Sequence, residues 1–364
     1  MNSLPSLTQA VTAFAPVTLS PDTPPMICAR QLILERVHEM VKHEAGTRQG
    51  QDLEALHDMR VWSRRLREAL EIFGFCFPQK VYDKIYQRVR QVTKALGAAR
   101  EADVAVEFFT NIHAQTQDLI ERFALEDLLM RLTKDQQRER ARMQDRLDRK
   151  AKVSALPEEM TAVFQRLSAQ PVSRQRGPRT AIRLARNLLS QRLNTVFAVR
   201  RALTGEDDVN GLHNLRIAVK KLRYALEVLE FAAGENAAGY LRFFKKLQTA
   251  LGELHDRDVF IATVKQRYDA LQSKAYSDLL RGGYEKIFAD LAQQRHRFYQ
   301  EYTELFAEAK LAEWRRLVVP PPPASKKRPA APASKRNGNA IPARAPEGGE
   351  ERAVHDHSNS PAVA

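Results

Sequence analysis

The sequence predicts an all-α protein built from two matching helical bundles. Hydrophobic residues recur with helical spacing over almost all of residues 30–317, and proline is nearly absent inside the long periodic segments. The β-branched alternation that marks strands is rare there. An internal repeat of about 150 residues divides this region into two units, which we expect to pack face to face about a pseudo-two-fold axis.

The repeat is clearest in one helix. Residues 56–73 read LHDMRVWSRRLREALEIF, and residues 212–229 read LHNLRIAVKKLRYALEVL. A second segment, LGAAREADV at 96–104, returns as LGELHDRDV at 251–259. Two arginines before the first motif also return at the same spacing, Arg30 and Arg36 as Arg186 and Arg192.

Composition and proline positions set the expected limits of the units. Pro157, Pro171 and Pro178 bracket the change from one unit to the next, and Pro178 suits the start of a helix. The C-terminal stretch is rich in Pro, Ala, Ser and charge, which predicts disorder. We therefore expect a mobile leader at 1–27, a helical domain at 28–317 with bundles at 28–165 and 175–317, and a disordered basic tail at 318–364.

The charge balance indicates a polyanionic partner. Lys and Arg number 58 against 44 Asp and Glu, which gives a formal net charge of +14. Such a surface attracts nucleic acid, phosphate polymers or anionic lipid. The chain has no apolar run long enough to cross a membrane, and its two cysteines provide no disulfide framework, so we expect a cytoplasmic protein.

The repeated helix carries its cations along one side. At about 100° per residue, the opposite side is apolar in both copies, as in a helix that is buried on one side only. We call the charged sides the first and second cationic stripes; they hold His57, Arg60, Arg64, Arg67 and Glu71, and His213, Arg216, Lys220, Arg223 and Glu227. One more cation lies at the margin of each stripe, Arg65 and Lys221.

Repulsion within the stripes favours a binding role. Like charges at i and i+4 destabilise a helix by a few tenths of a kcal/mol per pair, and one acid per stripe cannot neutralise three cations. Two stripes with matched positions are therefore better explained by a polyanion-binding surface. A solvated face balanced by acids elsewhere is the alternative.

Each stripe begins with a histidine one turn from an arginine. The neighbouring cations should disfavour protonation in the free protein, and a bound anion should favour it. The resulting hypothesis is that His57 and His213 gain a proton when a polyanion binds.

The second repeated motif mixes acids with bases. Asp103 and Asp258 occupy matching positions, and we expect them, with Glu71 and Glu227, to hold neighbouring arginines in a fixed orientation. Direct metal binding by these acids is the alternative, and our prediction includes neither a metal nor a cofactor.

These motifs resemble those of the CHAD domain, the conserved histidine α-helical domain. Its mark is a His-x-x-Arg-Val-x-x-[Arg/Lys]-[Arg/Lys]-Leu-Arg helix that occurs twice, each time followed by a Leu-Gly-x-x-Arg-Asp-x-Asp-Val-like segment. Here the copies read HDMRVWSRRLR with LGAAREADV and HNLRIAVKKLR with LGELHDRDV. Ile217 replaces the usual valine, and His255 replaces a basic or polar residue. Neither departure removes a cationic stripe.

The resemblance implies two four-helix bundles with a basic face or pore between them. It also implies non-catalytic binding of inorganic polyphosphate and a location on the polyphosphate granules of a bacterium. The polyphosphate-binding residues would be Arg30, His57, Arg60, Arg64, Arg65, Arg67, Arg186, His213, Arg216, Lys220, Lys221, Arg223, Lys245 and Lys246.

Three other functions are weighed against this one. Non-specific binders of single-stranded nucleic acid present aromatic platforms, but aromatics make up only 7% of this chain, so nucleic acid bound by its phosphates is the main alternative. A metal-dependent phosphohydrolase would use the pairs His57–Asp58 or His255–Asp256, but their arginine-rich surroundings repel a divalent ion. A membrane partner is not expected, because the apolar sides of the stripe helices are needed for the bundle. The sequence leaves the oligomeric state open.

Overall fold

The computed structural model describes residues 14–50, 53–148, 152–169, 177–234, 236–271 and 277–306. These ranges contain helices, turns and bends and no strand, which confirms the predicted all-α fold for them. The chain divides into two compact units, residues 1–321 and 322–364, and every described residue belongs to the first. The predicted tail lies outside the described residues.

Among the described residues, the first half of the chain has six α-helices and the second half has four. The first half has α2 (Pro25–Lys42), α3 (Glu44–Gln49), α4 (Leu53–Phe73), α5 (Gln79–Gln115), α6 (Leu119–Arg146) and α7 (Leu156–Ser168). The second has α8 (Ala181–Ala202), α9 (Val209–Val228), α10 (Ala237–Asp269) and α11 (Ser277–Leu305). Short 3₁₀ helices are η1 (Gly74–Cys76), η3 (Val153–Ala155) and η5 (Glu230–Ala232). Among these described helices, none has a stretch that is long and apolar enough to span a membrane.

Local chemistry sets several helix ends. Gly50 closes α3 with φ of 71°, a left-handed conformation that glycine adopts without steric cost. The carboxylate of Asp118 accepts the backbone N–H groups of Ile120 and Glu121 and so caps the start of α6. Asp208 caps α9 in the same way through the N–H of Gly211. This last cap fixes the beginning of the helix that carries the second cationic stripe.

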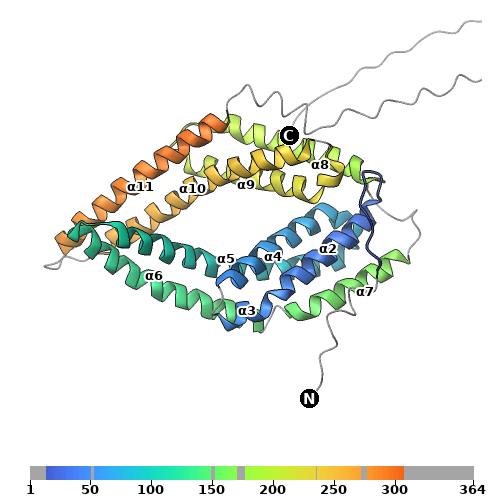
Figure 1. Cartoon of the computed structure of the whole chain (residues 1–364), viewed down its shortest axis with the longest axis horizontal. Helices are drawn as coiled ribbons and strands as arrows, with labels where there is room; N and C mark the ends of the chain where they lie inside the picture. The colour runs from blue at the N-terminus through green and yellow to red at the C-terminus, as the bar shows by residue number, and fades with distance from the viewer. Residues whose placement is uncertain are drawn as a thin grey trace, which may run out of the picture. The chain divides into compact units, whose positions relative to one another are not determined.

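The main helices contact one another in a closed order. Each helix contacts the next in the order α2, α4, α5, α6, α11, α10, α9, α8, and α8 contacts α2 again (Figure 1). A further contact joins α4 directly to α9. The helices of the two cationic stripes therefore meet each other, although 156 residues separate them in sequence.

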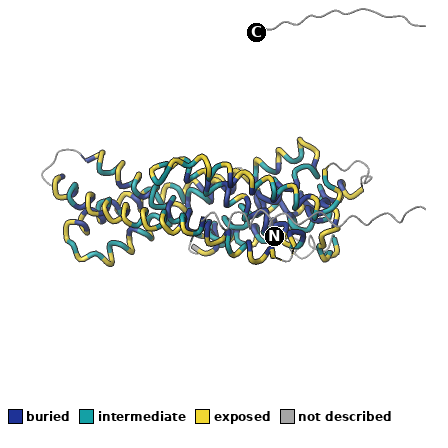
Figure 2. Tube along the Cα trace, turned by 90° about the horizontal axis from the view of Figure 1, so that it is seen from above, coloured by how far each residue is buried: buried dark blue, intermediate teal, exposed yellow. Residues whose placement is uncertain are grey.

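The hydrophobic cores do not follow the repeat. One core combines residues of both halves, including Ile33 and Leu70 from the first and Leu222 and Phe244 from the second. The other is formed where α5 and α6 meet α10 and α11, around Phe109 and residues of the second half. Within single helices, buried and exposed residues alternate along the tube in Figure 2. The expected separate four-helix bundle in each half is therefore not established by the packing.

The predicted leader overlaps the described residues only in part. The carbonyl of Thr23 accepts a hydrogen bond of 2.9 Å from the N–H of Ala181, and that of Pro21 accepts one of 2.8 Å from Ile182. The N–H of Val17 donates to Gln31 Oε1 at 3.1 Å. The residues just before α2 thus contact the first turn of α8. The limits proposed for the leader and the two bundles stay predictions.

Candidate functional site

The two cationic stripes lie against each other. On α4 and α9 the apolar sides are buried as predicted, with Leu66, Phe73, Leu215 and Leu222 fully inaccessible. The charged sides of the two helices lie close enough to repel each other. The charges of Arg60, Arg64 and Arg67 on α4 lower the pKa of Lys220 on α9. The cations of the two helices repel each other. The buried apolar sides and the ion pairs described below hold the helices together in spite of this repulsion.

The centre of this cluster has an excess of positive charge, although Asp256 and Glu101 act on Arg216 from beyond ion-pair distance. Within the described residues, Arg64, Arg216 and Lys220 make no ion pair and no side-chain hydrogen bond. The Nε atoms of Arg60 and Arg64 are buried and likewise have no acceptor in the part of the chain that is described. Arg60 does reach an acid, Glu101 of α5, at 3.7 Å. Buried donors without acceptors are costly, so this centre is suited to an anionic ligand.

Burial and repulsion shift the proton affinities in the same direction. Burial, and then the charges of Arg216, Arg64, Arg67 and Arg60, together lower the pKa of Lys220 to about 8. Burial also lowers the pKa of Arg60 and of Arg216. A bound phosphate would oppose all of these shifts, because an anion favours the charged form of each group.

The outer members of the stripes are paired with acids. Arg67 Nε lies 3.9 Å from Glu71, and the hydroxyl of Tyr86 donates to the same carboxylate at 2.5 Å. Arg223 lies 3.0 Å from Glu227 and donates to Gln248 at 2.7 Å. These pairs leave the C-terminal end of each stripe less positive than its middle.

Two ion pairs join the repeats beside the stripes. Arg65 Nε of α4 lies 2.8 Å from Glu227 of α9, and its guanidinium also lies 4.7 Å from the Trp62 ring. Arg192 of α8 pairs with the buried Glu68 of α4. Arg65, predicted as a ligand contact, is thus already engaged with an acid of the other repeat.

The histidines of the two stripes have different surroundings. His213 Nδ1 lies 3.3 Å from His255 Nδ1 of α10, and the ring centroids are 4.6 Å apart. Burial and then Arg216 and Lys220 lower the pKa of His213, which is the direction expected from the sequence. His57 is half-buried and has no hydrogen bond or ion pair among the described residues. The pair with His255 was not predicted.

The remaining predicted contacts lie outside this cluster or at its surface. The guanidinium of Arg30 lies 4.3 Å from the Phe14 ring, and Arg186 is half-buried on α8. Lys221 of α9 and Lys245 and Lys246 of α10 are exposed. The structure thus brings together Arg60, Arg64, Arg67, Arg216 and Lys220, whereas a ligand role for these other residues stays a prediction.

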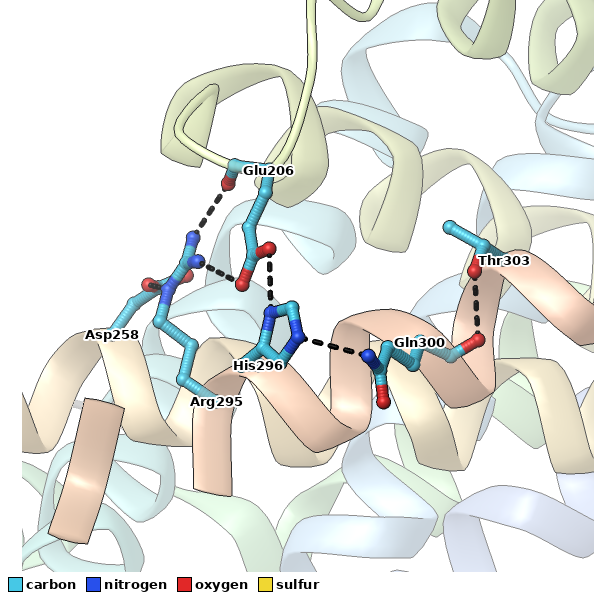
Figure 3. Close-up of polar contacts among 6 residues, drawn as sticks. All are labelled: Glu206, Asp258, Arg295, His296, Gln300 and Thr303. Carbon is cyan, nitrogen blue, oxygen red and sulfur yellow. Dashed lines mark hydrogen bonds and ion pairs between the residues drawn. The ribbon is translucent and has the colours of Figure 1, made fainter. Parts of the chain in front are cut away.

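A repeated acid–arginine contact holds the segment before each stripe helix. Asp103 accepts both Arg140 Nη2 at 2.9 Å and Nε at 3.1 Å, and Arg140 also donates to the carbonyl of Gly50 at 3.4 Å. In the second repeat Arg295 Nε donates to Asp258 at 2.6 Å, and its Nη2 donates to the carbonyl of Glu206 at 2.8 Å (Figure 3). His296 adds a contact of 2.9 Å to the Glu206 carboxylate.

Sequence reasoning missed the two arginines of this contact. Arg140 and Arg295 are 155 residues apart, as Asp103 and Asp258 are, so the repeat offset could have found them. The visible match between the helices is misleading, because QQR at 136–138 resembles QQR at 293–295 at an offset of 157. That match would pair Arg295 with the exposed Arg138.

Comparison with solved structures finds the same fold. The crystal structure of the CHAD domain from the plant Ricinus communis matches with a TM-score of 0.61 and 21% identity, and covers 80% of this chain and 94% of that chain. PptA from Streptomyces chartreusis matches with a TM-score of 0.60 and 12% identity, and covers 79% of this chain and all of its own length. At such low identities the likeness concerns the fold.

Family comparison gives the classification. A search of curated proteins found no match. The family model of the CHAD domain matches residues 31–265, which include both cationic stripes and both copies of the second motif. The chain belongs to the CHAD domain family.

Proposed function

We propose that this protein binds inorganic polyphosphate between its two cationic stripes without converting it chemically. The observation that carries the proposal is the meeting of Arg64, Arg216 and Lys220, three cations from both repeats that form no ion pair in the described part of the chain. Asp256 and Glu101 act on Arg216 only from beyond ion-pair distance. The resemblance of the sequence to CHAD domains implies binding of the same polymer. A chain of phosphates would supply the missing negative charge from both sides at once.

The length of the stripes suits a polymeric anion. From His57 to Glu71 a helix rises about 21 Å at about 1.5 Å per residue. Positive charge is spread along this length on both helices, and its unpaired members Arg64, Arg216 and Lys220 lie near the middle. An extended anion can therefore contact more of it than a single phosphate can.

The aromatic residues near the stripes favour polyphosphate over single-stranded nucleic acid. Tyr224 is buried, with the guanidinium of Arg223 4.3 Å and that of Arg64 5.9 Å from its ring centroid. Arg65 covers the Trp62 ring in the same way. Base stacking needs an open ring face, which these contacts occupy. Duplex DNA bound through its phosphates is the second candidate, because it needs charge alone.

A binding role also fits the histidine–aspartate pairs better than metal-dependent hydrolysis. The charges of Arg216 and Lys220 act on His255, so a divalent ion there would be repelled. The carboxylate of Asp58 lies 3.8 Å from His43 Nδ1, so Asp58 contacts a residue outside the cationic stripe. We propose a cytoplasmic protein that reaches polyphosphate granules through this site.

A competition titration at fixed ionic strength tests the proposal. Long-chain polyphosphate, single-stranded DNA and duplex DNA are matched in phosphate concentration and compared on wild type and on Arg60→Glu/Arg216→Glu. The control is Arg122→Glu/Lys134→Glu, which makes the same charge change on exposed positions of α6. We expect polyphosphate to bind at least about tenfold more tightly than either DNA, and only the stripe variant to lose it.

Three outcomes contradict the proposal. DNA that competes equally would favour a general phosphate-backbone binder. Equal losses in both double variants would attribute the binding to overall basicity. A stripe variant that binds as well as wild type, with its helical circular dichroism intact, would exclude the stripes as the site.

A further inference from the structure

The second repeat contains a histidine pair at the start of its stripe. His213 of α9 and His255 of α10 direct their Nδ1 atoms at each other across 3.3 Å, with their rings tilted by 46°. This distance is slightly longer than an ordinary hydrogen bond between nitrogens and is short enough for one proton to be shared. The pair lies next to the unpaired Arg216 and Lys220.

The first repeat has a permanent cation at the matching place. His255 corresponds to Arg100, at the offset of 155 that relates the two copies of the second motif. Arg100 is charged at every physiological pH, whereas a histidine changes its charge near neutrality. The two positions thus differ in the dependence of their charge on pH, and Arg100 is in addition paired with Glu107 at 3.7 Å.

The groups that face the pair keep it neutral in the free protein. Burial, Arg216 and Lys220 lower the pKa of both histidines, and that of His255 falls to about 4. Asp258 acts on His213 in the opposite direction, but its carboxylate is already bound by Arg295 at 2.6 Å. Without a ligand, the second repeat therefore has one charge fewer at this position than the first.

We propose that His213 and His255 form a protonatable phosphate subsite, which takes up one proton when a phosphate group of the polymer binds beside it. This inference rests on the proposed function and adds His255 to the site. The bound phosphate would screen the pair from Arg216 and Lys220 and favour a charged imidazole. A second proton would place two cations 3.3 Å apart, so the pair should take up one proton and titrate as a unit.

The sign of the pH effect follows from this linkage. The ligand raises the proton affinity of the pair, so the affinity for polyphosphate increases as the pH falls and levels off below the pKa of the free pair. Lys220, with its pKa of about 8, also gains charge on binding near that pH. The window between pH 5.0 and 7.0 isolates the histidines, because Lys220 is already mostly protonated there.

The test measures affinity and proton uptake by calorimetry in two buffers of different ionisation enthalpy. Long-chain polyphosphate is the probe, because only its terminal groups titrate in this window. The informative variants are His255→Arg, which installs the residue of the first repeat, His255→Gln, and the reciprocal Arg100→His. We expect wild type to bind about tenfold more tightly at pH 5.5 than at pH 7.0 and to take up about one proton.

The variants separate this inference from a merely structural role. His255→Arg should bind at pH 7.0 at least as tightly as wild type and lose most of the pH dependence, whereas His255→Gln should lose the pH dependence and bind weakly throughout. His113→Gln, which replaces a histidine outside the stripes that contacts Glu126 at 3.2 Å, should keep the wild-type slope. An unchanged slope and proton uptake in His255→Arg would overturn the inference while leaving the proposed function intact. Wild type that binds no polyphosphate at any pH would instead refute the proposed function.

Discussion

Arg65 of α4 and Glu227 of α9 lie 2.8 Å apart, and their ion pair joins the two repeats. Glu227 also holds Arg223 of its own helix at 3.0 Å. The matching acid of the first repeat, Glu71, has both of its partners in that repeat, Arg67 and Tyr86. The pseudo-symmetry is therefore broken at this point. Glu227 forms an ion pair between the repeats, whereas Glu71 has contacts within its own repeat only.

Double-mutant cycles measure the worth of this contact. Both side chains are partly accessible, at 33% for Arg65 and 23% for Glu227, so solvent screens the pair. We expect Arg65→Ala and Glu227→Ala to show a coupling of about 0.5–1 kcal/mol in urea unfolding. The exposed pair Lys42–Glu39, 3.9 Å apart, is the control and should show almost none. A coupling no larger than the control would mean that the contact does not stabilise the interface.

Removing the buried aspartate of the second motif should be costly. Asp103 is 4% exposed and accepts hydrogen bonds from Arg140 and Gln136. We expect Asp103→Ala to lower the free energy of unfolding by about 2–4 kcal/mol, because it leaves a guanidinium without its acid. Asp135→Ala, which removes an exposed partner of Arg138, should cost less than about 1 kcal/mol. Similar losses in both variants would contradict the role assigned to Asp103.

The stripes could be predicted because a helical wheel needs only one helix. The period of 3.6 residues decides which side of α4 or α9 is apolar, and Leu66 and Leu222 are buried as that period requires. The wheel cannot say which helix will cover the apolar side. The two cores, each shared by both repeats, are set by contacts between distant residues such as Phe109 and Phe260, which local pattern does not encode.

The ends of the long helices α5 and α10 and two contacts between distant residues could not be predicted from local sequence. The turn after α5, at 116–118, contains no proline or glycine, and neither does the sequence that follows α10 at 270–276, so the usual helix-breaking signals are absent from both. Arg140 was missed because its partner Asp103 lies 37 residues earlier, on another helix. The pair His213–His255 was missed for the same reason, since the sequence places the two residues in different motifs.

Two helical glycines should respond oppositely to alanine. A Cβ on Gly283 of α11 would come within 2.5 Å of the Ile120 carbonyl oxygen and 2.6 Å of Ala124 Cβ on α6, whereas one on Gly252 of α10 would meet nothing within 4 Å. Gly252→Ala should therefore stabilise the protein by about 0.5–1 kcal/mol. Gly283→Ala should destabilise it by about 1–3 kcal/mol, because α6 and α11 must move apart. Thermal unfolding of both variants checks this, and a stabilised Gly283→Ala would show that the two helices do not approach so closely.

Lys220 should contribute to binding at the expense of stability. Its pKa falls from the ordinary 10.5 to about 8 in the folded chain, so the unfolded chain binds more protons between these values. The free energy of unfolding should then rise with pH from about 8 to 10.5. Lys220→Met removes the unfavourable buried charge, and we expect it to stabilise the protein at pH 7 by about 1–3 kcal/mol.

The same substitution should weaken polyphosphate binding, and the two measurements together make the test specific. Lys245→Met, at an exposed position of α10, is the matched control and should leave both the stability and its pH dependence almost unchanged. A Lys220→Met variant that is more stable, loses the rise above pH 8 and binds polyphosphate less tightly would show that this cation is kept for the ligand. A variant that is less stable than wild type would mean that Lys220 supports the fold, and the uncompensated charge at the centre of the stripes would then need another explanation.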